Sequence, residues 1–424
     1  MSFDSGLAPA GFRDGSEGFA LKIIGGLGAL ILSAGGVADA RAAAPERSIS
    51  ITPSVRLTYD SNVLGGRGVV RSNVSGDDDV RLSPSMGADI LYPLGRQSAF
   101  LAGSIGYDFY RRHSELNRER INLDGGLHLQ GPLGCAGTLA AGYSRRQSDI
   151  GDLILAPDGT TLVNIVNVQE NRRYSAKMSC GAAIGIRPGV GYTRSETRNS
   201  GSRSAQDIVS DTFTASLGYT RPSFGLLSIY GSYRNGRYPN RQEIPGVLFN
   251  DGIEVYSAGA SYDRDIGSRL GGAVSVGYTQ VEPKSSLVPK FHGLSYSAAL
   301  RFQPSSRLNT NLSASRSAEQ SNVLAVSYTI STAYAFSGSY SLSQRMSAPF
   351  SLGYSTRRFR ATSFLPGALV RGTDKTYDAS LGLRFKPRPK LNMGVDATYR
   401  KRTSDVGLLG YSSKQISAIM GLEL

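Results

Sequence analysis

The sequence predicts an all-β chain that closes into a transmembrane up-and-down antiparallel β-barrel of about 18 strands, with 16 as the alternative. Three observations lead to this fold class. Apolar residues recur at every second position in one segment after another. Short turns alternate with longer connections, which is typical of a barrel with periplasmic turns and extracellular loops. After residue 44, no segment approaches the roughly 20 apolar residues of a membrane helix.

Residues 374–402 show the repeating unit clearly, as two alternating runs around the turn residues 387–390. The intervening positions hold Gly, Ser, Thr, Asn, Arg and Asp, which suit an aqueous lumen. We therefore expect the apolar face to contact lipid. The apolar positions are Tyr377, Ala379, Leu381, Leu383 and Phe385, followed by Leu391, Met393, Val395, Ala397 and Tyr399.

The composition favours one repetitive β architecture over several soluble domains. The 424 residues include 51 Gly, 22 Tyr and no Trp, and the mean hydropathy is −0.19. The net charge of +14 suggests an anionic partner such as lipopolysaccharide or a polyanionic glycan. The 47 Lys and Arg residues are scattered and no nucleic-acid motif accompanies them, so we expect no nucleic-acid partner.

The first 44 residues read as a secretory signal peptide with a lead-in. Lys22 precedes an apolar run at 23–37, and small residues offer cleavage after Ala40 or Ala44. The remaining residues, 45–424, are predicted to form a single barrel domain. Export of such a barrel places it in the outer membrane of a Gram-negative bacterium.

The strands follow in order from the alternating run that starts at Ile49 and breaks at Asp60. We read residues 323–342 as one long strand that could break near Gly338. Its predicted apolar positions are Val326, Tyr328, Ile330, Tyr334, Phe336 and Tyr340. The last run resembles the terminal strand recognised by the barrel-assembly machinery, although Leu424 stands where Phe is usual. The predicted short turns are 93–95, 130–134, 187–188, 221–225, 265–268, 303–306, 344–345 and 386–389, and the longer connections are 62–79, 147–170, 199–208, 235–251, 280–291 and 361–373.

Aromatic residues concentrate near strand ends on the apolar faces. Because amphipathic rings favour the headgroup layer, they are predicted to form the two interfacial girdles. The predicted girdle residues are Tyr59, Tyr92, Tyr107, Phe109, Tyr143, Tyr192, Tyr219, Tyr278, Phe302, Tyr354, Phe385 and Tyr399.

The sequence offers no pattern for catalysis, for a metal or for a cofactor. His113, His128 and His292 share no metal-ligand spacing with one another or with cysteines. Neither a nucleophile elbow nor a phosphate-binding glycine loop occurs in a suitable context. We expect no enzymatic activity.

The two cysteines, Cys135 and Cys180, have the same apolar parity on two segments predicted to be adjacent antiparallel strands. If the register brings them within a residue or two, a cross-strand disulfide is feasible in the oxidising periplasm. The alternative is two small residues on a lipid-facing surface.

Basic residues outnumber acidic ones on the predicted polar face, where Asp89, Asp108, Asp124 and Asp396 also occur. A positive, water-filled lumen would favour anions. The alternative is that these charges pair with one another or fill a plugged interior. The predicted basic lumen residues are Arg56, Arg81, Arg146, Arg173, Lys177, Arg301, Arg307, Arg384, Lys386 and Arg400.

The first strand ends in Tyr59-Asp60-Ser61-Asn62, which resembles the start of the mature barrel in a family of outer-membrane β-barrel porins. Members of that family are often encoded beside exopolysaccharide synthesis genes. The resemblance implies a part in exporting an acidic polysaccharide, together with other export components. The alternatives are a general diffusion porin for small anions and a structural or adhesion barrel that acts through its loops. Outer-membrane lipid and lipopolysaccharide are expected contacts in each case.

Overall fold

The computed structural model describes residues 47–65, 76–148, 167–241, 252–286, 288–321, 326–361, 372–405 and 410–424, and all of them belong to the unit Ala34–Leu424. The predicted signal peptide and lead-in, residues 1–44, lie outside the described residues. Parts of the predicted long connections also lie outside them. No helix in the described ranges is long and apolar enough to cross a membrane.

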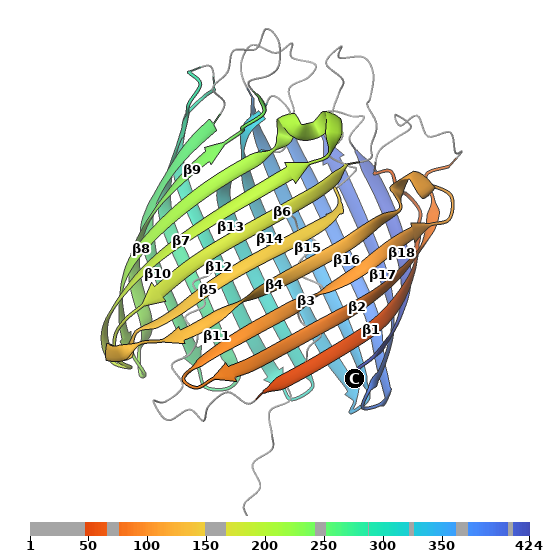
Figure 1. Ribbon diagram of the computed structural model, residues 1–424, viewed down its shortest axis with the longest axis horizontal. Helices are drawn as coiled ribbons and strands as arrows, with labels where there is room; N and C mark the ends of the chain where they lie inside the picture. Colours follow the sequence, from red (N-terminus) through yellow and green to blue (C-terminus); the bar gives the residue numbers. More distant parts are fainter. Residues whose placement is uncertain are drawn as a thin grey trace, which may run out of the picture. The chain divides into compact units, whose positions relative to one another are not determined.

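Eighteen antiparallel strands form one sheet, and the pairing of β1 with β18 closes it into a barrel (Figure 1). This confirms the predicted fold class and the count of 18. The strands are β1 (Ser48–Asp60), β2 (Asp79–Leu94), β3 (Gln97–Tyr110), β4 (Arg118–Gln130), β5 (Ala136–Gln147), β6 (Val168–Ser179), β7 (Gly185–Asn199), β8 (Ile208–Arg221), β9 (Gly225–Arg237), β10 (Gly252–Ile266), β11 (Leu270–Pro283), β12 (Phe291–Ser305), β13 (Leu308–Gln320), β14 (Val326–Ser343), β15 (Met346–Ala361), β16 (Thr373–Arg388), β17 (Leu391–Ser404) and β18 (Tyr411–Leu422).

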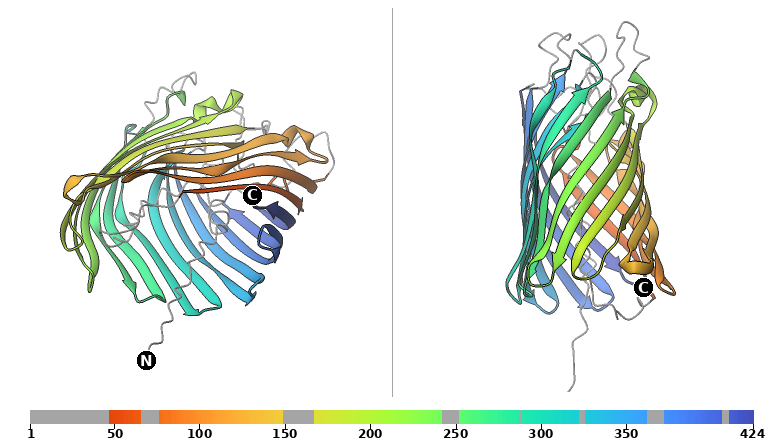
Figure 2. Two further views of the ribbon diagram at one scale, coloured as in Figure 1. Left: turned by 60° about the horizontal axis from the view of Figure 1, so that its bottom comes forward. Right: turned by 90° about the vertical axis from the view of Figure 1, so that its left-hand side faces the viewer.

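Each strand pairs with the next one in sequence, so short and long connections fall at opposite ends of the barrel (Figure 2). We call these the turn end and the loop end. In the described parts of the connections, three 3₁₀ helices occur: η1 (Ser114–Leu116) and η4 (Gly201–Gln206) at the loop end and η2 (Pro132–Gly134) at the turn end. The predicted strand at 323–342 is the single strand β14, in which Gly338 pairs with both Thr310 and Phe350.

One predicted turn is wrong, because Arg187 and Pro188 lie within β7 and the turn falls at residues 180–184. The prediction took Pro188 as a strand breaker. Pairing of β6 with β7 ends at Ser179 and Gly189, so Pro188 lies just beyond it. The missing N–H of proline therefore removes no bond from that ladder.

The two faces of the strands follow the sequence alternation. On β1, Ile49, Val55, Leu57 and Tyr59 are each exposed by more than 40% on the outward face. Arg56 has the opposite parity and faces the interior. Because large apolar side chains cover the outside, this surface suits lipid and the interior suits water.

Candidate functional site

The interior carries a wall of paired charges that runs over β16, β17, β1, β2, β3 and β4. Arg400 Nε lies 2.6 Å from Asp378 Oδ1. Three further aspartates are each approached by two arginines. Asp396 lies 2.7 Å from Arg384 and 3.8 Å from Arg56. Asp108 lies 4.0 Å from Arg81 and 3.9 Å from Arg120. Asp374 pairs with Arg402 and lies 3.8 Å from Arg357.

In these contacts seven arginines face four carboxylates, and Asp60, Asp89 and Asp124 also face inward on the same strands. Most of the side chains are about a quarter exposed, so the pairs are partly solvated and their net energies are modest. The sequence named Arg56, Arg81, Arg384 and Arg400 for the lumen. It did not name Arg120, Arg357 or Arg402, although all three share the parity of the predicted lumen residues.

Three predicted lumen cations lie on β5 and β6 without an ion pair to any described residue: Arg146, Arg173 and Lys177. Arg173 pairs in register with Gly142 and Lys177 with Thr138, so both face the interior across small or hydroxyl neighbours. Arg173 and Lys177 are four residues apart on the same face, or about 13 Å along the strand.

The remaining predicted cations lie toward the turn end. Arg301 is near the end of β12 and its Nη2 lies 2.8 Å from Asp265 Oδ1, with both side chains more than 60% exposed. Lys386 is an exposed residue near the end of β16. Arg307 was predicted on a strand face, but it lies in the turn between β12 and β13, because the ladder ends at Ser305 and Leu308. Arg307 therefore lies at the rim rather than on the lumen wall.

The wall formed by β13, β14 and β15 is neutral over most of its height and rich in hydroxyl groups. Its inward positions include Asn309 and Asn311 and a series of serines on all three strands. Ser351 Oγ, for example, lies 2.7 Å from Ser380 Oγ on β16. The charged wall thus continues into a wall that can donate and accept hydrogen bonds.

At the loop end the β13–β14 hairpin leans over the opening toward β9 and β10. Pairing of β12 with β13 ends at Tyr296 and Arg316, which frees the tip of β13. Tyr238 Oη donates to Ser327 O at 2.6 Å and accepts from Ser321 N at 2.8 Å. These contacts join segments more than 80 residues apart, so the tip of the β13–β14 hairpin is bound to the segment that follows β9.

Arg241 adds further contacts between the hairpin tip and the segment that follows β9. Its guanidinium donates to Val326 O at 3.1 Å and to Ser321 O at 2.9 Å, and it lies 3.5 Å from the centre of the Tyr238 ring. Arg241 is nearly fully buried. No local sequence pattern indicated this contact, because it joins two segments that are distant in the chain.

A small apolar core forms where the hairpin meets the wall. Its residues are Ile253, Val255, Val281, Val288, Ala318, Tyr328 and Ile330, with Phe291 packed against them. Tyr328 and Ile330 were predicted on the apolar, lipid-facing side of their strand, but they are buried. The correction has a physical cause: once β13 leaves β12, the outward face of the hairpin packs against the inward apolar residues of β10 and β11. The signal was present in Ile253 and Val255, which are apolar residues at inward positions.

The family signature lies at the seam of the barrel. Tyr59 faces outward, whereas Asp60 accepts hydrogen bonds from Ser413 Oγ (2.6 Å) and Gln415 Nε2 (2.7 Å) on β18. Ser61 and Asn62 also contact β18: Lys414 N donates to Ser61 Oγ (2.8 Å) and Asn62 Nδ2 donates to Ser412 O (3.3 Å). The signature thus fastens the first strand to the last.

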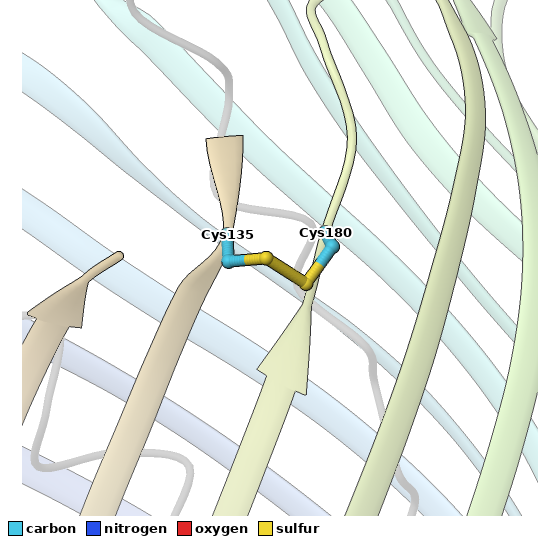
Figure 3. The surroundings of a disulfide bond; sticks show 2 residues. All are labelled: Cys135 and Cys180. Carbon is cyan, nitrogen blue, oxygen red and sulfur yellow. A yellow bond between two sulfur atoms is a disulfide. The ribbon is translucent and has the colours of Figure 1, made fainter. Parts of the chain in front are cut away.

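Cys135 and Cys180 are joined by a disulfide at the turn end (Figure 3). Cys135 immediately precedes β5 and Cys180 immediately follows β6. Because Ala136 pairs with Ser179, the register places the two cysteines opposite each other. Formation of the bond in the exported protein remains a prediction.

His113 has a structural environment. It is fully buried, and its Nδ1 lies 3.0 Å from Asp79 Oδ2. Asp79 also accepts from the main-chain N of Arg112 and His113, which holds the β3–β4 connection against the start of β2. Within the described ranges, no group of three or more His, Cys, Asp or Glu side chains could hold a metal ion.

Comparison with known proteins agrees with the barrel architecture. Residues 250–423, which include β10 to β18, match the sequence model of a family described as "Putative beta-barrel porin 2". The chain has the closed antiparallel β-barrel architecture that is typical of outer-membrane barrels. Such a fold spans the outer membrane of Gram-negative bacteria, with its short turns in the periplasm and its longer loops outside.

Solved porin structures also resemble the chain. Pseudomonas aeruginosa OccK2 (OpdF) is 10% identical, with a TM-score of 0.46 over 89% of this chain and 98% of its own. The structure of OccK2 in complex with glucuronate is 11% identical in sequence, with a TM-score of 0.46 over 89% of this chain and 98% of its own. Acinetobacter baumannii OccAB3 is 10% identical, with a TM-score of 0.43 over 89% of this chain and 99% of its own. No curated protein matches this chain in sequence.

Proposed function

We propose that the chain is an outer-membrane diffusion channel that favours small hydrophilic anions and is exported by the signal peptide predicted in residues 1–44. The inward cations of β5 and β6 that have no acidic partner among the described residues support this proposal most directly. Three aspartates are each shared by two arginines, and Arg146, Arg173 and Lys177 have no acidic partner among the described residues. Positive charge along a water-filled lumen lowers the electrostatic barrier for anions.

The size of the barrel is consistent with passive diffusion. Barrels of 16 to 18 strands generally leave an aqueous channel. Small side chains on the neutral wall leave room beside the charged one. The β13–β14 hairpin covers one side of the loop end and so favours small solutes over bulky ones.

Ion selectivity in planar bilayers tests the proposal. The intact protein should give a reversal potential of the sign expected for an anion-selective channel under a KCl gradient. Arg173→Ser should reduce that potential, and Arg173→Ser with Lys177→Ser should reduce it further. Arg172→Ser is the matched control, because Arg172 is the adjacent residue on the outward face. Cation selectivity of the intact protein, or equal effects of the two arginine variants, would overturn the proposal.

A second candidate is export of an acidic exopolysaccharide, which the geometry of the charged wall favours. On β16, ten residues separate Asp374 from Arg384, and the ion-paired residues along them follow the strand for about 33 Å. A track of this length beside a hydroxyl-rich wall suits a chain with both carboxylates and hydroxyl groups. The barrel-assembly machinery would insert the barrel through β18, and other export components would deliver the polymer.

Polysaccharide in a deletion strain tests this candidate. Loss of polymer outside the cell with accumulation in the periplasm would support it, and restoration by the intact chain would exclude an indirect effect. The combined variant Arg301→Ser, Arg384→Ser and Arg400→Ser should then fail to restore export. Unchanged polymer in both compartments would leave only the diffusion channel.

A further inference from the structure

The outward face at the loop end has two arcs of different charge. Over β4 to β12, acidic and basic side chains pair with each other. Arg145 lies 2.5 Å from Glu119 and also pairs with Glu170. The other pairs are Arg172–Glu170, Arg194–Glu196, Arg198–Glu196, Arg194–Asp211, Arg237–Asp211 and Lys290–Glu282.

Over β13 to β18, the outward strand positions at the same end carry cations and no carboxylate. We call these residues the basic arc: Arg316, Arg358, Arg360, Lys375, Lys401 and Lys414. All except the half-buried Arg316 are exposed. No Asp or Glu occupies an outward position in the described residues of these six strands. In the connections, residues 322–325, 362–371 and 406–409 contain none either. The one carboxylate in the described parts of these connections is the exposed Asp405, which follows β17 and accepts a hydrogen bond from Thr373 N at 2.7 Å.

The position of the basic arc relative to the membrane surface follows from a band of outward tyrosines on the same strands. Tyr334, Tyr354 and Tyr377 form a band of outward rings, with ring centres 6.4 and 5.0 Å apart along the series. Lys375 lies two residues beyond Tyr377 toward the loop end, and Arg358 lies four beyond Tyr354. At about 3.3 Å per residue, these two cations lie about 7 and 13 Å outside the aromatic band along their strands, and Arg360, six residues beyond Tyr354, lies about 20 Å outside it. Since that band marks the headgroup boundary, the arc lies in the phosphate and sugar layer.

The cations of the arc are close enough to repel each other. Lys401 pairs with Ser412 while its neighbour Tyr399 pairs with Lys414, so the two lysines are diagonal neighbours on adjacent strands. Lys375 and Lys401 have the same relation across β16 and β17. In addition, Nε of Arg316 is buried without a hydrogen-bond partner. A bound anion would relieve the repulsion and could satisfy this donor.

We infer that the basic arc binds the phosphate groups of an outer-leaflet glycolipid of the lipopolysaccharide class. Arg and Lys side chains are the usual partners of phosphate, and the arc offers both. The surface below the arc is apolar and faces lipid, so a phosphate that carries acyl chains fits it better than free phosphate. The β4–β12 arc does not compete, because its cations are already paired with carboxylates. This inference depends on the outer-membrane location and not on which solute the channel passes.

Binding of purified lipid A to the detergent-solubilised barrel tests the inference. The test variant is Lys375→Gln, Lys401→Gln and Lys414→Gln. The matched control is Arg172→Gln, Arg194→Gln and Arg198→Gln, which removes the same number of charges from the paired arc. A basic residue at an anionic membrane surface contributes about fivefold in affinity, so the test variant should bind bisphosphorylated lipid A about 100-fold more weakly. The control should change affinity by less than about fivefold.

The phosphate dependence separates the specific interaction from acyl-chain contact. Dephosphorylated lipid A should bind the intact protein as weakly as bisphosphorylated lipid A binds the test variant. Equal binding of both lipids, equal effects of the two triple variants, or no binding at all would overturn the inference. If the test variant does not fold, the single variant Lys401→Gln is compared with Arg172→Gln as its control. Lys401→Gln should then lower the affinity for bisphosphorylated lipid A about fivefold. Ion selectivity should be unchanged in the test variant, so failure here does not bear on the proposed channel.

Discussion

Replacing Asp60 with Ala should weaken the closure of the barrel by about 3 kcal/mol. Asp60 accepts two hydrogen bonds across the seam, from Ser413 Oγ at 2.6 Å and Gln415 Nε2 at 2.7 Å. It also accepts a local bond from Asn62 N at 2.9 Å. A hydrogen bond to a charged group contributes about 1.5 to 3 kcal/mol, and the lower figure applies because these groups are partly exposed. The two cross-seam bonds then account for the expected loss.

Urea unfolding of the purified barrel in detergent measures this loss as a change in the free energy of unfolding. Asp89→Ala is the matched control, because Asp89 is an inward carboxylate on β2, is exposed and has no hydrogen-bond or ion-pair partner among the described residues. The control should change stability by less than about 0.5 kcal/mol. If Asp60→Ala costs no more than the control, the signature does not fasten the seam. A double-mutant cycle with Gln415→Ala should show a coupling of about 1 to 2 kcal/mol.

Three further predictions concern the lumen, the loop end and the turn end. Asp396→Asn should increase anion selectivity, because it releases the two arginines that share this carboxylate; a reversal potential that shifts toward cations would contradict this. Tyr238→Phe should speed hydrogen exchange at the Ser321 amide about tenfold, since one hydrogen bond of about 1.4 kcal/mol is lost; an unchanged rate would mean that the hairpin is held by its apolar contacts alone. Cys135 and Cys180 should give no free thiol before reduction. Because the bridge spans 45 residues, its reduction should lower the free energy of unfolding by about 4 kcal/mol. Two titratable thiols without reductant would exclude the bond.

The strand alternation was enough to predict the fold and the class of the site. Each strand spans the membrane on its own, and its two faces meet different solvents, so local sequence records the environment directly. Cys135 and Cys180 could be placed on neighbouring strands for the same reason. Their alignment could not be predicted, because it depends on the register of β5 and β6, and the long connection at 148–167 that joins these strands does not specify a register through its sequence.

The loop end could not be predicted because its structure depends on contacts between distant segments. Tyr328 has the same strand parity as the lipid-facing Tyr334, yet one is fully buried and the other is 45% exposed. What separates them is the end of β12–β13 pairing, which no local pattern marks. The same limit applies to the lumen charges. Parity places Arg384 and Asp396 inside, but only the register brings them within 2.7 Å.

The charges of β17 also help to fix that register. Arg400 and Arg402 face inward, and Lys401 between them faces outward. A shift of one residue would turn both arginines toward lipid and leave the buried Asp374 without Arg402. Arg402 and Asp374 are only 3% and 1% exposed, so their pair dominates the cost of such a shift.

Breaking this buried pair should be far more costly than replacing it. Arg402→Met alone should lower the free energy of unfolding by about 3 to 5 kcal/mol, because it removes the buried cation that contacts the buried carboxylate of Asp374. Combining it with Asp374→Leu should recover at least half of that loss, since an apolar pair of similar volume removes the buried charge. Urea unfolding of the two variants decides the matter. A double variant as unstable as the sum of the single ones would mean that the two residues act separately and do not specify the register as a pair.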